Sequence, residues 1–190
     1  MIEASGDSAH PGRSIDDNFE SSITYEIAQS LKAALLEQCP HLKVLINRSP
    51  HETIAALQNA NFANKLNVDF YVSIHAFTEA ETKPRIYVYQ FSYRDNFISK
   101  DADQRLSFYP FDKIYLINTT QTTTWAQQIK QLLERDQRWS THGPFAIPFK
   151  PLIGIKAPAI GIEIGLKNRA EWQNAVDLLV HAIVDIVNNR

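Results

Sequence analysis

The chain has 190 residues, of which 44% are hydrophobic and 21% are charged, values that exclude a disordered or fibrous protein. Its 19 basic and 21 acidic residues give a formal net charge of −2, which provides no electrostatic footprint for nucleic acid or an anionic membrane. The single cysteine, Cys39, excludes an internal disulfide and a Cys-rich zinc module, and no apolar run is long enough to span a bilayer.

The chain begins with a polar segment, MIEASGDSAHPGRSI. This segment lacks the basic start and the apolar core of a secretory signal. The sequence therefore leaves open either a cytosolic protein or a mature form from which a signal has been removed. The length predicts one domain.

Segments with helical spacing then alternate with short apolar runs. Apolar residues on one face predict helices, and short runs bounded by proline or other turn residues predict strands. The predicted helices are 22–38, 51–65, 122–134 and a last helix from 172, preceded by a start signature at Asn168 and Glu171. The predicted strands are 42–47, 69–74, 86–92, 113–118 and 159–165.

This alternation predicts an α/β fold with three layers. Nearly continuous apolar strands such as DFYVSI and AIGIEIG are typical of a sheet that is covered on both faces. We therefore expect a mixed central sheet of about five to six strands with helices on both faces. The polar segment 93–111 is expected to be an insertion or a mobile loop.

Two polar residues lie in or at the end of the predicted central strands. His75 follows the strand 69–74, and Glu163 lies inside the strand 159–165. Carboxylates are costly to bury unless they are paired, protonated or bound to a metal. Glu163 is therefore a candidate site residue, with a side chain that reaches water or an arginine as the alternative. For His75 the alternative is a core histidine with satisfied hydrogen bonds.

Two further candidates lie near the N-terminus. His10 belongs to the turn-rich segment GDSAHPGR, and Glu20 precedes the first predicted helix. The helix N-terminus would stabilise the carboxylate of Glu20, which is otherwise an exposed first-turn acid. Together, His10, Glu20 and His75 would form a His₂Glu set, which suits zinc with one position open for water.

The same residues occur in four ordered blocks that resemble the zinc-dependent N-acetylmuramoyl-L-alanine amidases, the type-3 family of cell-wall hydrolases. DSAHPG resembles the opening D-x-G-H-G-G, and ESSITYEIAQSL resembles the helix start E-K-D-x-x-L-x-I-A-x-x-L. ANKLNVDFYVSIHAF resembles A-N-x-x-x-A-D-L-F-V-S-I-H-A-N, and PAIGIEIGLKN resembles P-A-V-L-V-E-x-G-F-x-S-N. The order of the blocks makes the resemblance specific.

The resemblance implies one catalytic amidase domain over 1–190, with a phosphorylase/hydrolase-like fold. It implies that His10, Glu20 and His75 bind Zn²⁺, and that Glu163 takes the proton of the zinc-bound water and then protonates the leaving amine. The substrate would be peptidoglycan or a muropeptide, cut between the lactyl group of N-acetylmuramic acid and L-alanine. It further implies a periplasmic or extracellular location, a protein activator as a partner, and regulation by a segment over the zinc, for which 93–111 is the candidate.

Several positions depart from the family pattern. Ala9 and Pro11 replace glycines beside the first histidine, Phe77 replaces the asparagine after S-I-H-A, and Asn59 replaces an arginine. The polar MIEASG stands where the family has an apolar strand, which predicts a weak edge strand or a truncated N-terminus. The alternatives to an active amidase are an inactive amidase-like module that binds muropeptide or a division partner, and a zinc hydrolase of another amide.

Overall fold

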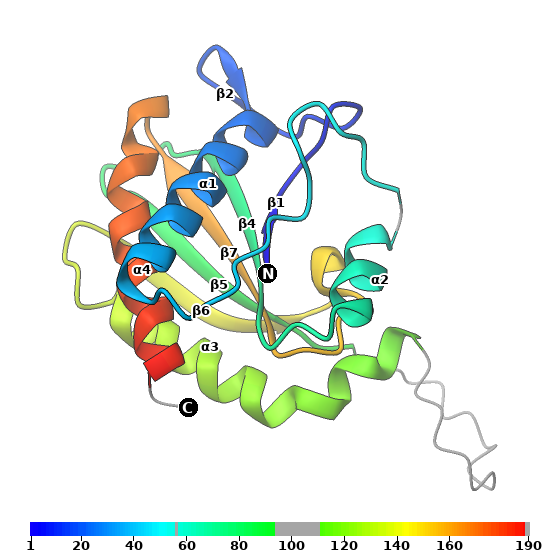
Figure 1. Cartoon of the computed structure of the whole chain (residues 1–190). Coiled ribbons are helices and arrows are strands. Elements are labelled where there is room, and N and C mark those ends of the chain that lie inside the picture. Colours follow the sequence, from blue (N-terminus) through cyan, green and yellow to red (C-terminus); the bar gives the residue numbers. More distant parts are fainter. Residues whose placement is uncertain (56, 94–110, 189–190) are drawn as a thin grey trace, which may run out of the picture.

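A computed structural model describes residues 1–55, 57–93 and 111–188. Its centre is a mixed sheet of five strands in the order β1-β4-β7-β5-β6 (Figure 1). β1, β4 and β7 are parallel, β5 is antiparallel to β7, and β6 is parallel to β5. The strands are β1 (Ile2–Ala4), β4 (Tyr71–Thr78), β5 (Arg85–Phe91), β6 (Ser140–Ile147) and β7 (Ala159–Leu166).

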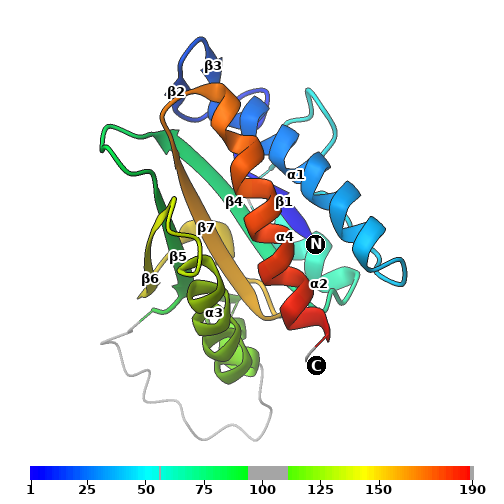
Figure 2. The ribbon, with the colours of Figure 1, turned by 90° about the vertical axis from the view of Figure 1, so that its left-hand side faces the viewer.

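Helices cover the two faces of this sheet unequally. Three long helices, α1 (Glu20–Gln38), α3 (Thr119–Leu133) and α4 (Trp172–Asn188), pack on one face and form the main core (Figures 1 and 2). On the other face, α2 (Gln58–Lys65) and the 3₁₀ turn η2 (Lys150–Leu152) join a smaller apolar cluster. The predicted three-layer α/β arrangement is therefore confirmed, with a thinner second helical layer.

The two faces of the sheet have different chemistry because side chains alternate along each strand. On β7, the even-numbered residues 160–166 are isoleucine or leucine and lie in the main core. The odd-numbered residues 161, 163 and 165 are Gly, Glu and Gly, and they face the other side. β4 alternates in the same way, with Val72, Ile74 and Ala76 in the main core. The opposite face, which we call the site face, is therefore left for polar and aromatic side chains.

Several predicted elements differ in the structure. The segment 42–47 forms a single parallel bridge, between Ile46 and Ile2, because β1 offers only three residues to pair with. The segment 113–118 lies in a 3₁₀ helix, η1 (Phe111–Asn118), since a short apolar run by itself does not distinguish strand from helix. The helix predicted from 51 begins at Gln58, after His51 and Leu57 adopt positive φ angles of 64° and 62°.

β6 was not predicted from the sequence. β6 contains Gly143 and Pro144, which weaken the strand signal in the sequence. The proline is tolerated because β6 is an edge strand with a register shift opposite β5. The predicted weak first strand is confirmed, since β1 is short and lies at the other edge. A two-stranded hairpin of β2 (Ser14–Ile15) and β3 (Asn18–Phe19) precedes α1.

Residues 94–110 of the expected insertion 93–111 lie outside the described residues. Of the helices that the structure describes, none has both the length and the hydropathy that crossing a membrane requires.

Candidate functional site

Strand register brings two of the predicted site residues together. His75 on β4 pairs with Glu163 on β7, and Glu163 in turn pairs with Tyr87 on β5. Residues in register on neighbouring strands point to the same face of a sheet. His75 and Glu163, although 88 positions apart, therefore stand side by side in the middle of the site face.

Glu20 reaches the same place from the first turn of α1. Its Oε1 lies 3.1 Å from Nδ1 of His75 and accepts the backbone N–H of Ala76 at 3.3 Å, while Oε2 accepts the N–H of Arg13 at 3.2 Å. Burial alone would raise the pKa of Glu20, but the hydrogen bond and charge of His75 and the two N–H groups lower this pKa overall. Glu20 is only 4% exposed, so it is a fixed carboxylate and not the exposed first-turn acid of the alternative interpretation.

The loop that carries His10 is held by Asp7. The Asp7 carboxylate accepts the N–H groups of Ala9, His10 and Ile54 at 2.7–3.0 Å. Burial would raise the pKa of Asp7, but these bonds lower it to about 2. The His10 ring contacts the same carboxylate at 3.2 Å, and its side chain is 78% exposed. The imidazole of His10 thus points largely to solvent.

Gly12 allows this loop to lie directly against Glu20. Its φ angle is +80°, and a Cβ atom there would lie 2.6 Å from Oε2 of Glu20. Only glycine combines the left-handed conformation with so close an approach. The loop backbone is therefore part of the wall around Glu20, even though the His10 side chain turns outward.

Glu163 has two partners on the site face. It forms an ion pair with Nη1 of Arg13, and its Oε2 accepts the hydroxyl of Tyr89 at 2.9 Å. Burial and the charge of Glu163 raise the pKa of Tyr89 well above its ordinary value. The Glu163 side chain is 15% exposed, and the Arg13 guanidinium lies 5.9 Å from the ring centroid of Phe77. Of the possibilities that the sequence left open for Glu163, pairing with an arginine is the one observed.

The donors fit zinc in chemistry, and two of them fit it in position. Glu20 Oε1 and His75 Nδ1 are 3.1 Å apart, close to the ~3.3 Å edge of a tetrahedron with bonds of about 2.0–2.1 Å. The second ring nitrogen of His75 lies 3.0 Å from the Ser73 hydroxyl, and a hydrogen bond at this nitrogen is what orients a metal-bound histidine. His10 does not complete the set, and no group of three His, Cys, Asp or Glu side chains in the described residues is placed to hold a metal ion.

Sequence reasoning missed several contributors. Arg13 lies in the turn-rich segment GDSAHPGR, and Tyr89 lies in the predicted strand 86–92; neither was predicted to be a site residue. Glu3 on β1 is buried at 8% exposure beside Ser73, its register partner on β4. Burial raises the pKa of Glu3, although nearby His75 and Ser73 partly offset this effect. The signal that the sequence offered for Glu3 was a glutamate between Ile2 and Ala4, at the start of a segment where the family has an apolar strand.

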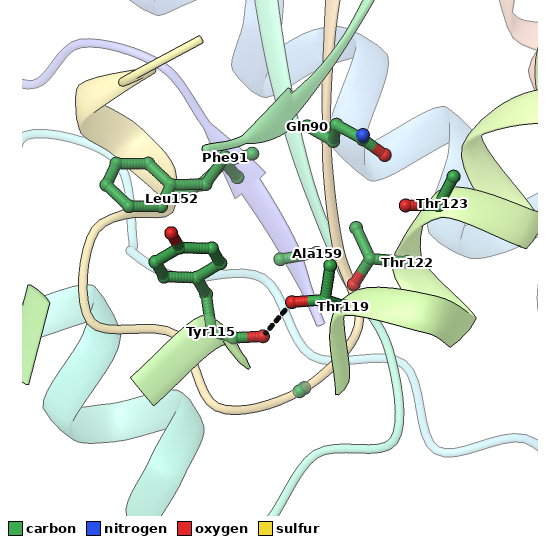
Figure 3. A pocket seen from close by; sticks show the side chains of 9 residues that line it. Gln90, Phe91, Tyr115, Thr119, Thr122, Thr123, Leu152 and Ala159 are labelled. Atoms are coloured by element: carbon green, nitrogen blue, oxygen red, sulfur yellow. Dashed lines mark hydrogen bonds between the residues drawn. The ribbon is translucent and has the colours of Figure 1, made fainter. Parts of the chain in front are cut away.

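Two cavities of the described part of the chain lie away from this site. A pocket of about 10 Å³, room for roughly one water molecule, lies between β5 and α3, and at its lining the Thr119 hydroxyl donates to the Tyr115 carbonyl at 3.1 Å (Figure 3). A larger open groove of about 340 Å³ is lined by residues of α2, η1 and the segment 156–158. Neither is lined by His10, Glu20, His75 or Glu163.

Comparison with known proteins places this geometry in a family context. Residues 1–180 match the family model described as N-acetylmuramoyl-L-alanine amidase. A curated relative, N-acetylmuramoyl-L-alanine amidase CwlM of Bacillus licheniformis, is 30% identical over 78 residues, which are 41% of this chain and 31% of the relative. The matched stretch thus spans about a third of that relative's length.

Solved structures of similar proteins share the fold at low identity. The catalytic domain of the amidase CwlV from Bacillus (Paenibacillus) polymyxa var. colistinus is 17% identical, with a TM-score of 0.65 and coverage of 100% of this chain and 97% of that one. The amidase Ami1 of Mycobacterium smegmatis is 16% identical, with a TM-score of 0.71 and coverage of 100% and 96%. The CwlD amidase of Clostridioides difficile, in complex with the GerS lipoprotein, is 15% identical, with a TM-score of 0.62 and coverage of 100% and 98%.

Proposed function

The chain belongs to the N-acetylmuramoyl-L-alanine amidase family, and on this premise we propose that it cleaves peptidoglycan between the lactyl group of N-acetylmuramic acid and the L-alanine of the stem peptide. The observation that carries the proposal is the convergence of Glu20, His75 and Glu163 on the site face. These residues come from α1, β4 and β7, and each stands in a block that resembles the family pattern.

Glu163 is the proposed general base and acid. Its carboxylate takes the proton of the attacking water and then delivers it to the nitrogen of the departing L-alanine. Tyr89 holds one carboxylate oxygen, which fixes the direction of the other. Arg13 pairs with that other oxygen, Oε1, so its guanidinium has to move before water can reach it. The Arg13 side chain is 53% exposed, so its guanidinium can leave the pair by rotating into solvent.

We further propose that the cofactor is Zn²⁺, held by Glu20 and His75, with His10 as the third ligand after rotation of its side chain. Support comes from the 3.1 Å separation of the Glu20 and His75 donor atoms and from the His10 side chain, which is 78% exposed and contacts the carboxylate of Asp7. When bound, zinc lowers the pKa of a bound water to ~7 and polarises the carbonyl to be attacked. Glu20 is suited to bind a cation because its lowered pKa keeps it ionised.

A second candidate is an amidase-like module that binds muropeptide without cutting it. The Arg13–Glu163 ion pair and the outward His10 favour this alternative, since both must change for the first proposal to operate. Both candidate functions act on cell-wall material, as a substrate or as a bound ligand, so we propose a location outside the cytoplasmic membrane. The lipoprotein complex of the CwlD amidase supports the proposal that a partner protein activates this chain.

The test is the release of soluble fragments from purified sacculi, with the zinc content of the same sample measured alongside. We expect about one zinc per chain and free L-alanine amino groups among the products. Glu163→Gln should keep the zinc while activity falls by at least about a hundredfold, the scale of general acid–base catalysis. Glu134→Gln, on the distant ion pair with Lys130, is the matched control.

The other outcomes separate the alternatives. Bound zinc without cleavage would identify the non-catalytic module. Cleavage of peptides that lack the lactyl group would identify a zinc hydrolase of another amide. Absence of zinc would refute the assignment of His10, Glu20 and His75.

A further inference from the structure

A continuous set of aromatic rings covers the part of the site face beside Glu163. We call it the aromatic platform. Tyr89 stacks on Phe149 with ring centroids 4.8 Å apart and an interplanar angle of 9°, and Tyr87 stacks on His142 at 5.1 Å. Phe145 lies 5.9 Å from Tyr89 and 6.4 Å from Tyr87. The platform consists of Phe77, Tyr87, Tyr89, His142, Phe145 and Phe149.

The strands and the glycines of β7 create this platform. Tyr87 and Tyr89 are on the side of β5 opposite to the core residues Ile86 and Val88. A Cβ atom at Gly161 would lie 2.5 Å from the Phe149 ring, and one at Gly165 would lie 2.8 Å from the Phe77 ring. These two glycines flank Glu163 on the same face, so each makes room for one ring. The catalytic carboxylate is therefore framed by aromatic side chains on both sides.

The outer part of the platform is open. Phe145 on the edge strand β6 is 43% exposed, and it adjoins the rings of Tyr87 and Tyr89, so the exposed phenyl group extends a continuous aromatic surface. Among the described residues, α2 and η2 cover the part of this face around Tyr71, Phe91 and Ala159, and Phe149 of the platform packs against that cluster. An exposed aromatic surface next to a carboxylate is a candidate binding surface for a ligand.

The two arginines that approach the rings of the platform are both held in ion pairs. Arg13 at one edge is paired with Glu163, and Arg85, 5.9 Å from the Tyr87 ring, is paired with the buried Glu79. Besides the Tyr89 hydroxyl, which binds Glu163, the rings of the platform contribute the Tyr87 hydroxyl and the His142 imidazole as polar groups. Such a surface favours a flat, neutral ligand with hydroxyl groups over a charged peptide.

We propose that the aromatic platform binds a neutral N-acetylated hexopyranose ring of the glycan strand, stacked on Tyr87 and Phe145. This inference rests on the proposed function, because the scissile amide joins a sugar on one side to a peptide on the other. Neighbouring strands are about 4.8 Å apart, so β6 lies roughly 10 Å from β7. That span accommodates the lactyl group and one sugar ring between Glu163 and Phe145. The stem peptide then leaves on the opposite side, toward β4 and Phe77.

Binding can be measured without catalysis. The probes are tetra-N-acetylchitotetraose, which carries the sugar rings without a peptide, and the free stem peptide L-Ala-D-isoGlu-L-Lys. Isothermal titration of the metal-free protein should show binding of the oligosaccharide, and Phe145→Ala should weaken it at least about tenfold. Phe62→Ala, which removes a 38% exposed phenyl group on α2, is the matched control and should leave the affinity unchanged. Urea denaturation of each variant verifies that it is folded.

The outcomes distinguish the two proposals. Oligosaccharide binding that Phe145→Ala weakens supports the sugar platform, even if the protein never cleaves sacculi. Cleavage of sacculi with no oligosaccharide binding, or with a KM that Phe145→Ala does not raise, overturns the platform while the amidase proposal stands. Binding of the stem peptide that depends on Phe145 also overturns it, since the platform would then hold the peptide.

Discussion

Gly161→Ala tests the frame around Glu163 most directly. The new Cβ would lie 2.5 Å from Cε1 and 2.8 Å from Cδ1 of Phe149. Carbon atoms normally approach to about 3.5 Å, so the ring has to move by about 1 Å. This movement disturbs its stacking on Tyr89, at 4.8 Å between centroids, and its edge contact with His75, at 5.2 Å.

The energetic consequence can be worked out from these contacts. Two aromatic pairs are worth about 0.5–1.5 kcal/mol each, and alanine in a strand regains roughly 0.5–1 kcal/mol relative to glycine. We therefore expect Gly161→Ala to lower the free energy of unfolding by about 1 kcal/mol. In a Phe149→Ala background the obstructing ring is absent, and the same change should stabilise the protein by about 0.5 kcal/mol.

Urea denaturation of the four proteins in this cycle gives the interaction energy. The reasoning predicts a coupling of about 1.5 kcal/mol between positions 161 and 149. Equal effects of Gly161→Ala in both backgrounds, within about 0.5 kcal/mol, would show that the ring contact does not control this position.

Three further predictions follow from single contacts. Arg13→Ala should raise the affinity for zinc about tenfold, because it removes a positive charge beside Glu163. Competition with a chelator measures this affinity, and Arg138→Ala is the remote control. An unchanged affinity would contradict the proposed effect of the Arg13 charge. Arg48→Met should lower the free energy of unfolding by about 2–4 kcal/mol, since the buried guanidinium donates to the carbonyls of Ala4 and Ser21; a loss below about 1 kcal/mol would argue against this role. Burial alone would raise the pKa of Glu79, but its bonds to Arg85 lower this pKa overall. The free energy of unfolding of the native protein should therefore exceed that of Glu79→Gln fully above the ordinary pKa of 4.5, and the difference should disappear as the pH falls below 4.5 and through the lowered pKa of the folded protein. A difference that persists at pH 2 would contradict this linkage.

The sequence determined the features that depend on local periodicity and on burial. The apolar spacing of 22–38 and 122–134 predicted α1 and α3 within a few residues, and the run AIGIEIG predicted β7. These patterns are informative because one stripe of a helix or one face of a strand must be apolar to be buried. The ordered motif blocks also identified the family, which the match over residues 1–180 confirms.

Tertiary structure decided how these elements meet. Arg13 pairs with Glu163 across 150 positions of sequence, and no local pattern contains that contact. The outward turn of His10 depends on the carboxylate of Asp7 and on Ile54, which reaches that carboxylate from a different loop. β6, which contributes His142 and Phe145 to the aromatic platform, is a strand only because β5 lies beside it. Periodicity specifies which side of an element is buried, whereas the neighbours on a sheet are fixed by long-range register, and it is this register that places His75, Glu163 and Tyr87 in one row.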